Sequence, residues 1–420
     1  MRRDAYDRIT AAGQTGKGRN LHIGYRRDCE ENAALAAIAD ILTQRQDEWL
    51  SANAADVSAA KEAGMRPAML DRLTLTPERI AGIVDGVRQV SALPDPIGQV
   101  TKMETRPNGL IIGRRRVPLG VIAIIFEARP NVTVDAAALC LKSGNVCILR
   151  GGKEAIRSNR CVVKLMREAL HSVGLPEDCI SLVQDTSHET ANELMHLDGY
   201  VDVLIPRGGA GLIRAVAQEA SVPVIRTGEG VCHIYVDDEA DLDMAAKVLF
   251  NAKCSRPSVC NAVECVLVQE DIARDFWPKA LPLLDEKAVE LRADAAALDI
   301  LGTRALPAAE SDWDAEYDDY ILAVRTVKDM DEAIRFINQH GTGHSEAIIT
   351  KNYFKAQHFL DQVDASAVYV NASTRFTDGG EFGLGAEIGI STQKMHARGP
   401  MGLEELTSCK YVIYGEGQVR

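Results

Sequence analysis

The spacing of apolar residues divides the chain into a helical beginning and a longer region in which strands and helices alternate. Between residues 32 and 90, apolar residues recur at helical spacing and prolines separate the segments, so several helices are expected. Residues 103–117 read as two strands on either side of Asn108-Gly109, a dipeptide that favours a type I′ turn, and predict a β-hairpin. A last strand is predicted at residues 410–414.

From residue 121 onward, predicted strands and helices alternate regularly. Strands joined by crossover helices form a parallel sheet, so we predict a doubly wound α/β unit. A second α/β unit follows, interrupted by a Gly-rich segment at residues 379–389. In the first unit the expected strands are Val121–Phe126, Val146–Leu149, Ile180–Val183, Val201–Ile205 and Pro223–Arg226, and the expected helices are Val134–Lys142, Glu154–Val173, Glu189–His196 and Leu212–Ala220. In the second unit they include strand Ile234–Val236, helix Leu242–Ala252, strand Ala262–Val268 and strand Val368–Asn371.

Length and composition are those of an α/β protein with more than one domain. The chain has 420 residues, of which 46% are hydrophobic and 5% aromatic, and a domain usually holds roughly 100–200 residues. The net charge of −13 disfavours binding to nucleic acids or to anionic membranes. No apolar stretch approaches the roughly 20 residues of a membrane-spanning helix, and the first residues lack the apolar core of a secretion signal. Ten scattered cysteines indicate reduced thiols, so we expect a cytoplasmic protein.

A dinucleotide would bind where helix N-termini meet the carboxyl ends of the first set of strands. Two glycine-rich turns occupy such positions, Arg150-Gly151-Gly152-Lys153 after the second strand and Pro206-Arg207-Gly208-Gly209-Ala210-Gly211 after the fourth. Ordinary strand-to-helix turn chemistry explains the same glycines equally well. No Gly-x-Gly-x-x-Gly follows the first strand, and the glycines of residues 383–389 are spaced differently and fit an active-site loop better.

Cys260 is the candidate nucleophile that the residues themselves indicate. Pro257 ends the preceding helix, so Cys260 lies on a loop, whereas Cys254 falls in the last helical turn and Cys265 in the following strand, where both are expected to pack. The spacing of these thiols does not match a zinc site, and no metal is expected. A cysteine on a loop is often inert, so this pattern leaves the role of Cys260 open.

Charged residues flank this loop. Lys253 and Arg256 would lower the pKa of the Cys260 thiol and favour the thiolate. The acidic run at residues 237–243 lacks the glycine and the final glutamate of a calcium-binding loop. It is better explained as carboxylates at a helix N-terminus.

Three sequence blocks carry a family resemblance. They comprise residues 117–122 with 126–133, Arg256–Asn261, and Asn371–Gly383. Together they resemble the γ-glutamyl phosphate reductases, a branch of the aldehyde dehydrogenase superfamily, and the resemblance extends in order from about residue 30 to 415. It implies an aldehyde dehydrogenase-like α/β fold. Its parts would be an NADP-binding domain of residues 1–100 and 119–227, a catalytic domain of residues 228–398, and an oligomerisation element of residues 101–118 and 399–420.

For function, the resemblance implies NADPH-dependent reduction of L-glutamyl 5-phosphate to L-glutamate 5-semialdehyde, with release of phosphate, in proline biosynthesis. Cys260 would displace phosphate from the acyl carbon, and hydride from NADPH would then reduce the thioester through a thiohemiacetal. Asn131 falls where the superfamily keeps an asparagine that stabilises the oxyanion, although it could also cap its helix. The implied partners are glutamyl phosphate as the small-molecule substrate, further copies in a homo-oligomer, and a glutamate kinase that supplies the acyl phosphate.

The resemblance also assigns residues to the cofactor. Arg150 and Lys153 fall at the adenosine ribose, and Lys153 replaces an acid of NAD-preferring relatives, which suits a 2′-phosphate. Gly208 and Gly209 remain candidates for the phosphates. Glu316 matches the glutamate that holds the nicotinamide ribose, with an ordinary surface glutamate as the alternative.

Substrate binding is expected on two loops. Arg256, on the Cys260 loop, would meet the leaving phosphate, because a guanidinium binds two oxygens at once. Ser373 and Arg375 would bind the α-carboxylate, and polar surface residues of a Gly-rich loop are the alternative.

Two other functions stay open on the sequence, a hydrolytic semialdehyde dehydrogenase and a non-catalytic, for example RNA-binding, aldehyde dehydrogenase-like protein. In the superfamily's Glu-Leu-Gly-Gly-Lys motif the glutamate activates water, and in residues 226–230 that glutamate is displaced, which disfavours hydrolysis. The retained Cys260 and Asn131 and the negative charge disfavour the second function. Finally, the hairpin and the last strand are expected to pair between subunits, because an isolated hairpin is only marginally stable and the last strand needs an open edge.

Overall fold

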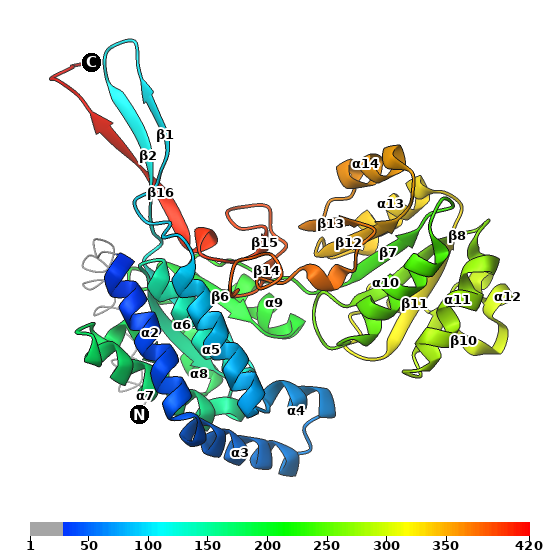
Figure 1. Ribbon diagram of the computed structural model, residues 1–420, viewed down its shortest axis with the longest axis horizontal. Coiled ribbons are helices and arrows are strands. Elements are labelled where there is room, and N and C mark those ends of the chain that lie inside the picture. Colours follow the sequence, from blue (N-terminus) through cyan, green and yellow to red (C-terminus); the bar gives the residue numbers. More distant parts are fainter. Residues whose placement is uncertain (1–27) are drawn as a thin grey trace. The chain divides into compact units, whose positions relative to one another are not determined.

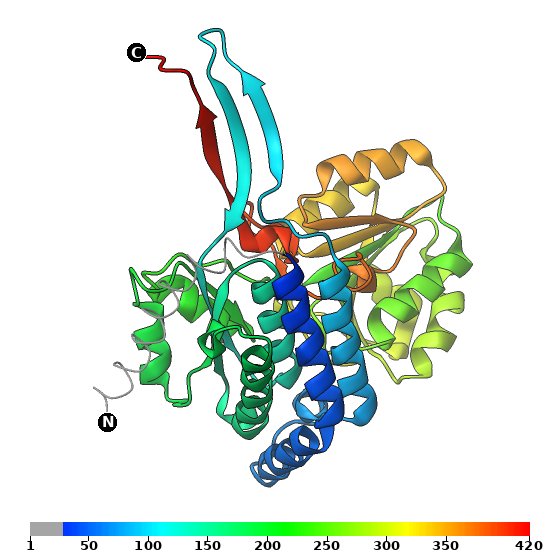
Figure 2. The same cartoon turned by 60° about the vertical axis from the view of Figure 1, so that its left-hand side comes forward.

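Two sets of strands organise the chain into two units. The first unit contains residues up to Thr227 together with Gly383–Gly389 and Met401–Arg420. The second contains Gly228–Phe382 and Ile390–Pro400. The computed structural model describes residues 28–420, and Figures 1 and 2 show the elements of both units.

Four parallel strands form the sheet of the first unit. In chain order they are β3 (Val121–Phe126), β4 (Val146–Gly151), β5 (Ile180–Leu182) and β6 (Val203–Arg207), arranged β5-β4-β3-β6. Every residue of β3 and β4 is buried, and a strand buried on both faces is a continuous apolar run in the sequence. The predicted parallel arrangement is confirmed.

Right-handed crossovers place helices on both faces of this sheet. The helices are α2 (Asp28–Gln44), α3 (Gln46–Glu62), α4 (Pro67–Leu73), α5 (Pro77–Ala92), α6 (Pro130–Lys142), α7 (Ile156–Ser172), α8 (His188–Met195) and α9 (Ala210–Glu219). The chain moves from β3 to β5 in one direction and returns to β6 in the other, so α6 and α7 lie on one face and α8 on the opposite face. Helices α2, α3 and α5 pack against α6 or α7. Helix α6 begins at Pro130, earlier than the predicted Val134, because proline suits the first helical position.

The predicted fifth strand at residues 223–226 is wrong. This segment forms only an isolated bridge between Leu204 and Val224. Pro223 has no N–H to give to a ladder. The segment is therefore held by two hydrogen bonds, from the Leu204 N–H to the Pro223 carbonyl (2.9 Å) and from the Ile225 N–H to the Leu204 carbonyl (3.0 Å).

The predicted hairpin is confirmed, with a different turn. Strands β1 (Val100–Thr105) and β2 (Ile111–Pro118) pair antiparallel. The Gly109 N–H donates to the Arg106 carbonyl (2.9 Å), so Pro107 and the residue after it form the centre of the turn. Gly109 follows with a φ of +85°. The ring of Pro107 keeps φ negative, which excludes it from the centre of a type I′ turn.

The last strand, β16 (Thr407–Tyr414), completes a three-stranded antiparallel sheet on the other side of β2. The pairing runs within one chain, from Thr407 opposite Pro118 to Tyr414 opposite Ile111. The prediction that these segments pair between subunits is therefore wrong, because β2 of the same chain supplies the open edge that the tail needs. In Figures 1 and 2 this sheet extends away from the four-stranded sheet of its unit.

A seven-stranded parallel sheet forms the second unit, in the order β10-β9-β11-β8-β7-β12-β13. Alternate residues face two cores: Ile234 and Val236 of β7 lie in one hydrophobic cluster and Tyr235 lies in the other. The strands are β7 (Cys232–Val236), β8 (Val263–Gln269), β9 (Glu290–Ala293), β10 (Ala305–Pro307), β11 (Ile321–Val327), β12 (Ser345–Ile349) and β13 (Ala367–Val370). The helices are α10 (Leu242–Cys254), α11 (Ala273–Asp285), α12 (Ala295–Leu301), α13 (Met330–His340), α14 (Tyr353–Gln362) and the short η5 (Thr374–Phe376). Two short strands, β14 (Ile390–Ser391) and β15 (Gly399–Pro400), pair separately.

Across residues 28–420, no helix has both the length and the apolar character that crossing a membrane requires.

Candidate active site

In the first unit, the carboxyl ends of three parallel strands lie side by side at the point where the order of the strands in the sheet reverses. Phe126, the last residue of β3, is level with Gly151 of β4 and Arg207 of β6. The crossovers lead from β3 to β4 on one side and reach β6 on the other, so β3 and β6 flank a topological switch point. Open α/β sheets bind ligands at such points, outside the carboxyl ends of the strands. Both predicted glycine-rich turns lie at this edge.

Glu127, which follows β3, occupies the start of helix α9. Its Oε2 accepts a hydrogen bond from the N–H of Gly209 (2.8 Å), the N-cap residue of α9. A Cβ on Gly208 would lie 2.5 Å from the same carboxylate oxygen, so a side chain here would displace Glu127. A phosphate at this helix end would take the place of the carboxylate. The sequence alone assigned no role to Glu127, although its place directly after the first parallel strand was an available signal.

The two cations predicted for the adenosine ribose lie in different surroundings. Arg150 is 9% exposed, and its Nη2 donates to the carbonyl oxygens of Thr186 (2.7 Å) and Ser187 (2.9 Å) just before α8. Burial lowers the pKa of Arg150. Lys153 is exposed and begins the short helix η1 (Lys153–Ala155). Arg150 therefore shapes the turn, and Lys153 presents its charge to solvent.

Asn131 lies in the first turn of α6. Its Nδ2 donates to Oδ2 of Asp135 (3.0 Å), one turn later. It does not cap the helix, because Arg129 is the N-cap residue and Pro130 takes the first helical position. The carboxylate of Asp135 thus fixes the orientation of the Asn131 amide.

In the second unit, Cys260 lies in a turn between α10 and β8 and is partly exposed, as the sequence predicted. Cys254 ends α10 and is 4% exposed, and Cys265 in β8 is 1% exposed. Burial raises the pKa of Cys254 to about 11 and raises that of Cys265 as well. Both therefore stay protonated near neutral pH, and the loop thiol of Cys260 is the one suited to react.

Lys253 is fully buried at the base of this loop. Its Nζ donates to Oε2 of Glu264 (2.6 Å), which is 1% exposed. Burial raises the pKa of Glu264 to about 8, against the opposing effect of Lys253. The Lys253 ammonium group therefore forms a buried ion pair with Glu264, which the sequence pattern did not predict.

A second loop brings Arg375 of η5 to the Cys260 loop. The Nε of Arg375 donates to Oγ of Ser255 (3.0 Å), and its Nη1 donates to Oδ1 of Asn261. Burial, and then the neighbouring Arg256 guanidinium, lower the pKa of Arg375, whereas the Asp378 carboxylate and then negative charge on Cys260 raise it. The Arg375 guanidinium is thus bound to the loop that carries Arg256 and Cys260, and a bound anion would stabilise the two like charges.

Ser373 and Glu316 are the other predicted residues of this unit. Ser373 is 4% exposed, and its Oγ accepts a hydrogen bond from the Arg375 N–H (3.3 Å), so it caps η5. Burial raises the pKa of Glu316, against the opposing effect of the Gly230 backbone N–H, which donates to its carboxylate. A Cβ on Gly230 would lie 1.5 Å from the Cys260 carbonyl oxygen. Glu316 is therefore linked to the Cys260 loop through Gly230.

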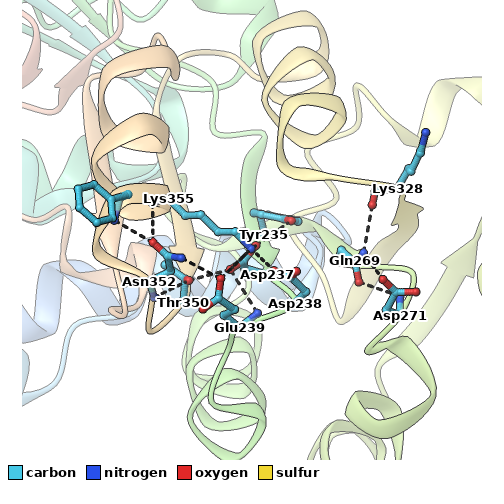
Figure 3. A network of polar contacts seen from close by, with 11 residues as sticks. Tyr235, Asp237, Asp238, Glu239, Gln269, Asp271, Lys328, Thr350, Asn352 and Lys355 are labelled. Carbon is cyan, nitrogen blue, oxygen red and sulfur yellow. Dashed lines mark hydrogen bonds and ion pairs between the residues drawn. The ribbon is translucent and has the colours of Figure 1, made fainter.

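The acidic residues before α10 bind a lysine. Asp237, Asp238 and Glu239 lie close enough together to share a cation. Lys355 of α14 supplies it: Nζ is 3.2 Å from both Asp237 and Glu239 and also contacts Asp238 (Figure 3). Asp241 accepts hydrogen bonds from N–H groups of the first turn of α10. The predicted place of this run at a helix N-terminus is confirmed.

The sequence profile described as "Aldehyde dehydrogenase family" matches residues 27–297 and 320–412. These residues include the strand ends of the first unit and both loops that meet at Cys260. The chain belongs to the aldehyde dehydrogenase family.

Curated relatives of this aldehyde dehydrogenase include proteins named γ-glutamyl phosphate reductase. The one from Clostridium perfringens (strain SM101 / Type A) is 58% identical and covers 97% of this chain and 98% of its own length. The one from Carboxydothermus hydrogenoformans is also 58% identical, over 93% of this chain and 94% of its own. The resemblance predicted from three sequence blocks is confirmed.

Solved structures give the same answer for the fold of this aldehyde dehydrogenase. The γ-glutamyl phosphate reductase of Thermotoga maritima has a TM-score of 0.93 and 46% identity, covering 98% of this chain and 99% of that chain. An acetylating aldehyde dehydrogenase from Geobacillus thermoglucosidasius has a TM-score of 0.74 at 16% identity, covering 100% and 99%. The second likeness concerns the fold alone. The predicted aldehyde dehydrogenase-like fold is confirmed.

Proposed function

We propose that this aldehyde dehydrogenase reduces L-glutamyl 5-phosphate to L-glutamate 5-semialdehyde with release of phosphate, in proline biosynthesis. The observation that carries the proposal is the loop thiol of Cys260 beside the guanidinium groups of Arg256 and Arg375. An acyl phosphate needs a nucleophile for its carbon and positive charge for its leaving group, and this loop supplies both. Relatives at 58% identity bear the name of this activity.

The chain's own residues account for the displacement of phosphate. The Cys260 thiolate attacks the acyl carbon and forms a carbon–sulfur bond. The bond between the acyl carbon and the bridging oxygen breaks, and phosphate leaves with that oxygen and the electron pair, which produces a thioester. Arg256, exposed on the same loop, binds the leaving phosphate, and Arg375 binds the α-carboxylate. Asn131, whose amide Asp135 orients, is the proposed donor to the oxyanion.

The strand ends of the first unit fit a nicotinamide dinucleotide. Lys153 is exposed there to pair with a 2′-phosphate, and the Gly209 N–H at the start of α9 suits a pyrophosphate oxygen once Glu127 moves. Among the described residues, the buried Nε of Arg150 has no hydrogen-bond partner, so this edge keeps an unused donor. When bound, NADPH supplies the hydride that reduces the thioester. Glu316 is the residue proposed to hold the nicotinamide ribose.

Two cysteine variants test the nucleophile. Cys260→Ser should abolish the reaction, whereas Cys254→Ser should retain it, because burial keeps Cys254 protonated. Activity is measured in reverse, as reduction of NADP⁺ by glutamate 5-semialdehyde. Full activity in Cys260→Ser, or loss of activity in Cys254→Ser alone, would reject the assignment.

The same assay separates the alternative functions. For the proposed enzyme, reduced cofactor should form only when phosphate or arsenate is present, because an oxyanion must release the acyl group from Cys260. A hydrolytic dehydrogenase would form reduced cofactor without either anion, and a non-catalytic protein would form none with either. The displaced glutamate at position 229 supports the first outcome.

We further propose that the exposed three-stranded sheet binds a second copy of the chain. Met103 of β1 is 48% exposed, and Tyr411, Ile413 and Tyr414 of β16 are 70%, 60% and 61% exposed. By the strand register Tyr411 and Ile413 share one face and Met103 and Tyr414 the other, and exposed apolar side chains on such a sheet favour a protein interface. We also propose a cytoplasmic location, which suits the reduced thiols. A glutamate kinase is the proposed partner, because it would supply the labile acyl phosphate.

A further inference from the structure

Asn261 directly follows the proposed nucleophile, and its side chain binds the neighbouring loop. It is 4% exposed. Its Nδ2 donates to the carbonyl oxygens of Arg375 (3.2 Å) and Thr377 (3.0 Å), and its Oδ1 accepts from Nη1 of Arg375. The Oγ1 of Thr374 donates to the Asn261 carbonyl (2.7 Å). One side chain therefore holds both the backbone and the guanidinium group of Arg375.

Ser255, at the start of the Cys260 loop, holds the same guanidinium group. Its Oγ accepts a hydrogen bond from Nε of Arg375 (3.0 Å). A planar guanidinium that is bound at both Nε and Nη1 has a fixed orientation. The position of this charge is therefore set by the Cys260 loop.

The two hydrogen bonds act against electrostatic repulsion. Arg256 lies on the same loop, and the burial of Arg375 and the Arg256 charge both disfavour the charged form of Arg375, an effect that Asp378 and Glu381 offset in part. An unrestrained guanidinium would move toward solvent and away from its like-charged neighbour. Asn261 and Ser255 keep it in place, where a bound anion would remove the repulsion.

We propose that Asn261 and Ser255 are positioning residues that hold Arg375 beside Cys260, so that its charge selects anionic reactants for the thiol. This inference rests on the proposed function, in which Cys260 attacks a substrate that carries a carboxylate and a phosphate. Loss of either side chain should lower the preference of Cys260 for anions. This lower preference for anions should also be seen when Cys260 reacts with a small reagent that is not a substrate.

Charge-selective alkylation measures this preference. Iodoacetate is an anion and iodoacetamide is a neutral reagent of similar size, and in both reactions the Cys260 sulfur displaces iodide. The rate constants are followed by mass spectrometry of the peptide that contains Cys260. Their ratio reports positive charge near the sulfur, and changes in thiol pKa affect both rates alike. Asn261→Ala should lower the iodoacetate-to-iodoacetamide ratio by about 3- to 10-fold, close to the effect of Arg375→Gln, and Ser255→Ala should lower it less.

Thr374→Val is the matched control. It removes one hydrogen bond between the same two loops and leaves both partners of the Arg375 guanidinium in place. It should lower stability toward urea, as Asn261→Ala does, without changing the alkylation ratio. An equal fall of the ratio in both variants would assign the effect to docking of the loops and contradict the role of Asn261.

Other results also decide the matter. A wild-type ratio in Asn261→Ala together with a low ratio in Arg375→Gln would mean that Arg375 keeps its place unaided, and a wild-type ratio in both would mean that its charge does not act on Cys260. Either result overturns the proposal. Failure of the proposed function is distinguishable, because the wild-type chain would then form no reduced cofactor that depends on phosphate or arsenate, whatever the alkylation ratio.

Discussion

Replacement of Gly230 by alanine should displace the Cys260 loop. A Cβ at this position would lie 1.5 Å from the Cys260 carbonyl oxygen, 2.4 Å from its carbonyl carbon and 2.7 Å from its Cα. An ordinary contact needs about 3.5 Å, so the two segments must separate by about 2 Å. All of these Cys260 atoms belong to the backbone, so no change of side-chain rotamer relieves the contact.

The expected effects are large on activity and moderate on stability. Overpacking of this kind costs about 1–3 kcal/mol, and a shift of about 1 Å in a reacting group can lower a rate about 100-fold. Gly230→Ala should therefore lose about 1–3 kcal/mol in urea unfolding, and its kcat for phosphate-dependent oxidation of the semialdehyde should fall about 100-fold or more.

Gly82→Ala is the control for this substitution. Gly82 lies inside α5, and an added Cβ meets nothing within 4 Å. This variant should gain about 0.5–1 kcal/mol, because alanine restricts the unfolded chain more than glycine, and it should keep wild-type activity. Wild-type activity in Gly230→Ala would refute the reasoning, because the Cys260 backbone would then tolerate the displacement.

Four further predictions concern other parts of the structure. Because burial raises the pKa of Glu264 from 4.5 to about 8, the folded chain keeps a proton that the unfolded chain releases. The contribution of Glu264 to stability should therefore fall as the pH rises toward 8. Urea unfolding at several pH values measures this fall, and Glu264→Gln should make the free energy of unfolding depend less on pH. Lys253→Met should cost about 3–5 kcal/mol at alkaline pH, and less in mild acid, where the isolated Glu264 takes up a proton. Lys153→Glu should lower the preference for NADPH over NADH, measured as a ratio of kcat/KM, by about 10-fold, and an unchanged ratio would remove Lys153 from the cofactor site. Ile413→Lys should reduce the particle mass in light scattering, and a wild-type chain that is monomeric at micromolar concentration would contradict the proposed interface.

The sequence by itself determined the elements and several features of the candidate site. Strands β3 and β4 are continuous apolar runs because both of their faces are buried, so their periodicity identified them directly. Their alternation with helices determined the parallel sheet, because a crossover of this length returns the chain in the same direction. Pro257 follows the end of α10, and this local effect sufficed to place Cys260 on a loop. The predicted strand at residues 223–226 was wrong, because Pro223 has no N–H for a strand ladder although the segment has an apolar pattern.

Only the tertiary structure decided which polar side chains meet. Arg375 binds Asn261, 114 positions earlier in the chain, and Glu127 binds the N–H of Gly209, 82 positions later. The periodicity of a segment reports which of its faces is buried, but it carries no information about the segment that covers this face. The tail strand shows the same limit, since its pattern predicted a strand that needs an edge and the packing of the chain supplied β2. Local sequence predicts most of the helices and strands, and contacts between distant segments determine which charges, donors and acceptors surround Cys260.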